Sequence, residues 1–85
     1  MIIGSEYIIK SSYLRGLRKY EDAIDIIEKN IDNIDVTIQT VAWLAAFYAA
    51  KDAKNINLAN KYAKLVAEDD NQIPSIQNYL NYLLI

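Results

Sequence analysis

The sequence predicts an all-α fold of about five helices, packed as antiparallel hairpins in a single domain covering residues 1–85. Apolar residues recur three and four positions apart through most of the chain, which is the spacing of one face of a helix. Short polar breaks separate these periodic segments. The most regular stretch, residues 41–70, holds two such segments, with small residues where two helices would press together. The helical hairpin is therefore the predicted building unit.

The composition argues against several classes of function. The chain has no cysteine and no histidine, so it lacks disulfides, thiolate metal sites, the usual general base and the commonest metal ligand. Its only glycines are Gly4 and Gly16, so there is no glycine-rich phosphate loop. We therefore expect a non-catalytic protein with no cofactor and no bound metal. The hydrophobic content of 53% is generous for 85 residues and suggests that a partner covers some apolar surface.

Charge and hydropathy favour a cytoplasmic protein that binds neither membranes nor nucleic acid. The net charge is −2, and no apolar run approaches the roughly 20 residues that span a bilayer. The beginning of the chain has no basic leader before an apolar core, as a signal peptide would have. A local basic cluster (Lys10, Arg15, Arg18 and Lys19) leaves nucleic-acid binding as a minor hypothesis. Frequent isoleucine and asparagine, which have AT-rich codons, suggest a bacterial or phage genome.

The first hairpin is predicted from two amphipathic segments, residues 5–16 and 20–31. Ser5 is the expected N-cap of the first helix, and Gly16 either ends that helix or permits a close contact. The packed side of the first helix comprises Tyr7, Ile8, Lys10, Ser11, Leu14 and Leu17. Residues 17–19 form the turn. The second helix carries a continuous apolar stripe of Tyr20, Ala23, Ile24, Ile27 and Ile31.

The second hairpin is predicted over residues 36–50 and 56–68, with Asp35 as the cap of its first helix. Five alanines between residues 42 and 50 leave room for close neighbours on two sides, so we expect residues 36–50 to form the most buried helix. The inner stripe of the next helix comprises Ile56, Ala59, Ala63 and Val66. Pro74 then occupies the first position of a last helix, residues 74–85. Tyr20, Tyr62 and Tyr82 are interpreted as half-buried packing residues.

The helix pairs repeat, since Ala23 and Ala59 occupy matching places 36 residues apart. On this pattern the chain resembles the tetratricopeptide repeat family. The second pair matches at Trp43, Ala46, Phe47, Ala50, Ala59, Ala63 and Val66, the first at Tyr7, Ser11, Leu14, Tyr20, Ala23 and Ile27, and the last helix at Tyr79. The resemblance implies a right-handed array of hairpins 5–31 and 35–68 with a capping helix, 74–85. Ala50, Phe47 and Asp70 depart from the family pattern, and an ordinary small helical bundle has the same periodicities.

The resemblance also implies a concave groove that holds an extended or helical peptide. Its lining would be Ile8, Ser12, Arg15, Leu44, Tyr48, Lys51 and Asp52. Arg15 and Lys51 could hold a carboxylate, because charge-assisted hydrogen bonds to carboxylates are strong. The alternative is that both are solvated charges at helix ends. The leading hypothesis is a small adaptor or inhibitor that binds another protein or peptide.

The alternative function is self-association through the last helix, whose apolar stripe ends the sequence without a polar cap. The stripe could serve as a lid on the preceding helix, or pair with a second copy to form a homodimer. The self-association residues would be Tyr79, Tyr82, Leu83, Leu84 and Ile85.

Overall fold

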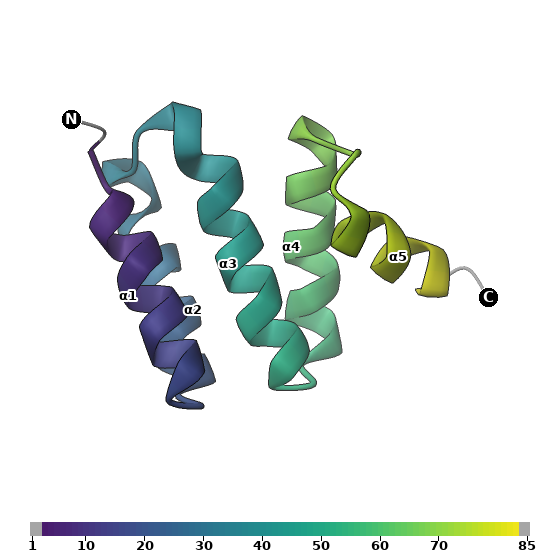
Figure 1. Ribbon diagram of the computed structural model, residues 1–85, viewed down its shortest axis with the longest axis horizontal. Coiled ribbons are helices and arrows are strands. Elements are labelled where there is room, and N and C mark those ends of the chain that lie inside the picture. The colour runs from purple at the N-terminus through teal and green to yellow at the C-terminus, as the bar shows by residue number, and fades with distance from the viewer. Residues whose placement is uncertain (1–2, 84–85) are drawn as a thin grey trace.

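The computed structural model describes residues 3–83, and this part of the chain is all-helical. The five α-helices predicted from the sequence are present: α1 (Ser5–Gly16), α2 (Tyr20–Asn30), α3 (Gln39–Asp52), α4 (Ile56–Asp69) and α5 (Pro74–Leu83). Two short 3-10 segments, η1 (Ile31–Asn33) and η2 (Val36–Ile38), connect α2 to α3. Helices α1, α3, α4 and a tilted α5 follow one another along the longest axis, and α2 lies behind α1 (Figure 1). None of them combines the length and the apolar character needed to span a bilayer.

The turns inside the two hairpins have the same backbone conformation. One residue in each turn has a positive φ, 63° at Arg18 and 60° at Lys54. The following N–H donates to a carbonyl five positions earlier at 2.9 Å in both turns (Lys19 to Leu14, Asn55 to Ala50). The turns lie 36 residues apart, as do the buried Ala23 and Ala59. The chain therefore repeats in backbone as well as in sequence, whereas the tetratricopeptide arrangement itself stays a prediction.

Helix α3 is the centre of the core, as its alanines predict. It packs against α1 and α2 on one side and α4 on the other. Five of its residues are buried: Ala42, Ala46, Phe47, Ala49 and Ala50. Because four of the five are alanines, neighbouring helices can approach α3 without displacing large side chains. The most buried helix is thus the one that packs against its own hairpin partner, α4, and also against the first hairpin.

Enlarging Ala46 should therefore destabilise the protein. Its side chain is completely buried, so the Ala46→Leu variant has no space for three further carbons. We expect the free energy of unfolding to fall by about 1–3 kcal/mol through overpacking, measured by urea denaturation. Ala53→Leu, at an exposed position, is the control and should stay within about 0.5 kcal/mol of the parent. Equal effects of the two substitutions would contradict the central place of α3.

Several helix boundaries differ from the sequence prediction. Ser5 is not the N-cap: it is the first residue of α1, and Gly4 occupies the cap position with φ of 98°. Residues 36–38, predicted as helix, form η2, and the α-helix starts at Gln39. Asp35 does cap this segment, since its carboxylate accepts a hydrogen bond from the Thr37 N–H at 2.9 Å. That bond, with a second from the Thr37 hydroxyl, lowers the pKa of Asp35.

Some burial predictions were also wrong. Ile56, expected on the inner stripe of α4, is 63% exposed because the first turn of α4 extends beyond the core. Tyr62, expected to be half-buried, is fully buried, whereas Tyr82 is 73% exposed. Lys10 and Leu17, placed on the packed side of α1, are both exposed. At these positions the helix itself was predicted correctly, but the side of the helix that faces the core, or the extent of its covering, was not.

Candidate functional site

A row of interacting side chains joins the three alternate helices α1, α3 and α5. The Arg15 side chain lies over the Tyr48 ring at 5.2 Å, and its Nε donates to Asp52 at 2.6 Å. The Tyr48 hydroxyl is 2.9 Å from the Ser75 hydroxyl. We call these four residues the inner row. The sequence predicted Arg15, Tyr48 and Asp52 for one groove, and the structure brings these three together.

The ion pair in the inner row changes the role expected for Arg15. Its side chain is 40% exposed and that of Asp52 is 36% exposed, so the pair is accessible to solvent and adds only about 0.2–1 kcal/mol to stability. Arg15 was expected to hold a ligand carboxylate, but its Nε already donates to Asp52. Lys51 is exposed and, within residues 3–83, takes part in neither of the two ion pairs. Lys51 is therefore the more accessible cation beside the row.

An open hollow of about 430 Å³ adjoins the inner row between α3 and α5. Its lining comprises Lys51, Ser75, Asn78, Tyr79 and Tyr82. Tyr79 forms a fixed wall, because its hydroxyl donates to the Asn60 side chain at 2.6 Å and its ring meets the Phe47 ring edge-on at 5.0 Å. Burial raises the pKa of Tyr79. The hollow thus combines an ammonium group and an amide with two aromatic rings.

The remaining predicted groove residues contribute less accessible surface. Ile8 and Leu44 are partly buried and pack against the core, so they offer less surface to a ligand. Ser12 is exposed on α1. Sequence reasoning missed Ser75 and Asn78. A lone serine after Pro74 is typical of a helix start, and nothing in its local sequence indicates a contact with Tyr48, 27 residues earlier.

The residues predicted for self-association differ in their exposure to solvent. Tyr79 is engaged within the protein by Phe47 and Asn60, so it offers little to a second copy. Tyr82 is 73% exposed and Leu83 is 40% exposed. Leu84 and Ile85 lie outside the described residues. Helix α5 therefore presents Tyr82 and Leu83 at its surface.

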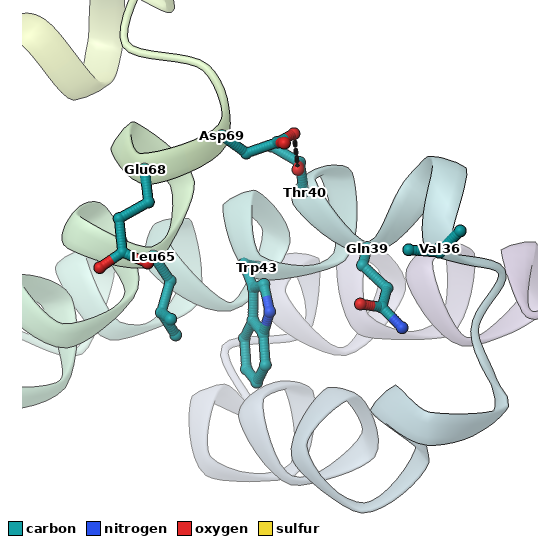
Figure 2. A pocket seen from close by; sticks show the side chains of 7 residues that line it. All are labelled: Val36, Gln39, Thr40, Trp43, Leu65, Glu68 and Asp69. Carbon is teal, nitrogen blue, oxygen red and sulfur yellow. Dashed lines mark hydrogen bonds between the residues drawn. The ribbon is translucent and has the colours of Figure 1, made fainter.

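A second hollow of about 310 Å³ lies between the start of α3 and the end of α4, as Figure 2 shows. Its lining comprises Val36, Gln39, Thr40, Trp43, Leu65, Glu68 and Asp69. The Thr40 hydroxyl donates to Asp69, and the Gln39 amide donates to the carbonyls of Ile31 and Ile34 at 3.3 and 3.1 Å. These polar groups hold the ends of helices together, so the hollow is a structural seam.

Next to this hollow, a cluster of aromatic and charged residues joins α3, α4 and α2. The rings of Trp43 and Tyr62 stack at 5.5 Å, and the Tyr62 hydroxyl donates to Glu28 at 2.5 Å. Lys61 donates to the same carboxylate at 3.1 Å. Burial opposes ionisation of Glu28, but these hydrogen bonds outweigh it and lower its pKa. Burial and the adjacent Glu28 carboxylate raise the pKa of Tyr62.

Comparison with protein-family models, curated proteins and solved structures finds no match to this chain. Among residues 3–83, no three acidic side chains gather closely enough to hold a metal ion. The inner row and the hollow beside it are therefore the features from which a function is inferred.

Proposed function

We propose that the protein is a small non-catalytic binding module, an adaptor or inhibitor, that holds an acidic segment of a partner protein on the inner row. The observation that carries the proposal is the contact chain from Arg15 through Tyr48 to Ser75, which joins three helices beside an open hollow. A reducing, cytoplasmic location suits a chain without cysteine and forms part of the same proposal.

The chemistry of the hollow supports a ligand that carries a carboxylate next to an apolar group. The ammonium group of Lys51 and the side-chain amide of Asn78 supply hydrogen-bond donors. The rings of Tyr79 and Tyr82 supply apolar walls, and aromatic residues are enriched at protein interfaces. Asp52 would repel an acidic ligand unless Arg15 neutralised it, so the ion pair has a clear role in this site. The resemblance to tetratricopeptide repeats, whose members hold peptides in a groove, agrees with this choice.

The hollow is small, which sets the expected strength of binding. At about 430 Å³ it lies near the lower end of the 300–1,000 Å³ that is usual for ligand pockets. It would accept one or two side chains of an extended peptide. We therefore expect affinities in roughly the micromolar range for a single peptide.

The test is binding of short random peptides, followed by affinity measurements on the selected sequences by fluorescence anisotropy. We expect enrichment of Asp and Glu, and the Lys51→Glu variant should weaken binding about tenfold or more, or about 1.4 kcal/mol. Lys64→Glu makes the same charge change at an exposed position on α4 and should leave affinity unchanged. Arg15→Glu places a second acid beside Asp52 and should weaken binding as well.

Two results would overturn the proposal. One is the absence of any selected peptide at high protein concentration, where weak binding is still detected. The other is equal loss of affinity in the Lys51→Glu and Lys64→Glu variants, since this would show a response to net charge rather than to the hollow. Unchanged affinity in both variants would contradict the proposal as well, because it would place the peptide elsewhere on the protein.

A further inference from the structure

Helix α1 carries a row of large apolar side chains that point away from the core. Ile9 and Tyr13 are each 67% exposed, and Leu17, at the turn after the helix, is 49% exposed. Each lies four positions after the one before it, so the three lie on one side of α1. We call them the α1 stripe. The buried residue of α1 is Ser11, which donates to the Ala23 carbonyl at 2.8 Å on the side facing α2.

The repeat within the chain shows what kind of surface covers this position. Adding 36 residues to the α1 stripe gives Ala45, Ala49 and Ala53. Ala49 is fully buried and Ala45 is partly buried, whereas Ala53, just after the end of α3, is exposed. The rings of Trp43 and Phe47 contact α4 and α5, so the alanine side of α3 faces its other neighbour, the first hairpin. This side of α3 is therefore covered by the first hairpin at Ala45 and Ala49, whereas the matching side of α1 is exposed at all three positions.

The identity of the residues makes this open side unusual. The outer face of a helical stack needs polar residues to stay in water. In α1 this face instead presents the α1 stripe, flanked by Glu6 and Lys10. Large side chains also fill more space than the alanines of α3, so they suit a partner helix that stands at an ordinary packing distance.

We propose that a second copy of this protein covers the α1 stripe, with the two α1 helices antiparallel about a two-fold axis. The stripe is symmetric about Tyr13, so this arrangement sets Tyr13 against Tyr13 and Ile9 against Leu17 of the second copy. Every large residue of the stripe then gains an apolar neighbour. Gly16 lies at the edge of the contact, and the space around its missing side chain is open.

Charge along α1 favours the antiparallel arrangement over the parallel one. Glu6 lies before the stripe, and the basic residues Arg18 and Lys19 follow it. The antiparallel pair brings Glu6 of each copy towards the basic turn of the other. A parallel pair would place Lys10 beside Lys10 and Glu6 beside Glu6, which is unfavourable.

The size of the contact predicts a weak dimer. Covering the exposed parts of the stripe in both copies removes roughly 700 Å² from water, below the roughly 1,200 Å² of a stable interface. We therefore expect dissociation constants of about 10 µM to 1 mM, the range of transient contacts. The dimer should form and dissociate as concentration changes.

The experiment is sedimentation equilibrium of the full chain from about 10 µM to 1 mM, spanning the expected dissociation constants. The average mass should rise from 9.7 kDa towards twice that value. Ile9→Ser with Tyr13→Ser should remain monomeric throughout, with an unchanged helical circular dichroism spectrum. The matched control is Val36→Ser with Ile56→Ser, which removes two side chains that are 78% and 63% exposed elsewhere. This control should associate like the parent.

A disulfide test fixes the orientation, because the chain has no cysteine of its own. A Tyr13→Cys variant should form covalent dimers on mild oxidation much faster than Ile56→Cys, since only residue 13 lies on the two-fold axis. A parent chain that is monomeric throughout the concentration range would overturn the proposal. So would association that survives Ile9→Ser with Tyr13→Ser but is lost in Tyr82→Ser with Leu83→Ser, which would place the contact on α5.

Discussion

Replacing Phe47 with alanine is expected to lower the free energy of unfolding by about 3–5 kcal/mol. Phe47 is completely buried, and its ring meets the Tyr79 ring edge-on at 5.0 Å. The substitution removes an aromatic side chain from the place where α3 contacts α5, and the alanines around it cannot fill the cavity. A domain of this size has a total stability of about 4–13 kcal/mol, so the variant would be close to unfolding only if the parent lies near the lower end of this range.

Chemical denaturation with urea, followed by circular dichroism, measures this loss. Phe47→Leu keeps most of the volume and should cost less than about 1.5–2 kcal/mol. Tyr13→Ala, which truncates an aromatic side chain that is 67% exposed, should change stability by no more than about 0.5 kcal/mol at low protein concentration. A loss below 1 kcal/mol in Phe47→Ala would mean that α5 does not dock on α3 as described.

The Gly4→Ala substitution is expected to cost about 2–4 kcal/mol. Gly4 has φ of 98°, a conformation that residues with a side chain rarely adopt. A Cβ atom there would also lie 2.6 Å from the Cα atom of Ile34, whose backbone cannot move without disturbing the α2–α3 connection. The positive φ and the steric overlap with Ile34 therefore each destabilise the Gly4→Ala variant.

The other glycine provides a control of opposite sign. Gly16 is the last residue of α1, and a Cβ atom added to it would meet no atom within 4 Å. Gly16→Ala should therefore leave stability unchanged or raise it by up to about 1 kcal/mol, because alanine favours the helix and restricts the unfolded chain. Thermal unfolding of the two variants under the same conditions gives the comparison. Equal destabilisation by both would contradict the described conformation of Gly4.

The sequence predicted the helices well because each depends on local spacing. The limits of α1 and α4 and the start of α5 follow from apolar periodicity, from the turn at residues 17–19 and from Pro74. The N-cap of α1 was assigned to Ser5 instead of Gly4, because the close passage of Ile34 favours glycine there and no local pattern reports a contact over 30 residues. Ile56 was misplaced because periodicity gives the face of a residue but not whether another helix extends far enough to cover it.

The candidate site was predicted in part for the same reason. Arg15 and Tyr48 were assigned to one face from their places in the repeat, and the Arg15 guanidinium does lie over the Tyr48 ring. The partner of Arg15 was missed, because any of several acids could have reached it and only the packing of α1 on α3 selects Asp52. The link from Tyr48 to Ser75 depends on the tilt of α5, which the sequence pattern does not specify.

The stacked pair of Trp43 and Tyr62 provides an intrinsic fluorescence probe of folding. Trp43 is the only tryptophan, and its ring lies 5.5 Å from a tyrosine whose hydroxyl reaches Glu28 on α2. Its emission should therefore respond when α4 separates from α3 or from α2, without an attached dye. Excitation energy absorbed by nearby tyrosines would pass to the same indole, so a single emission band would report on the integrity of both hairpins at once.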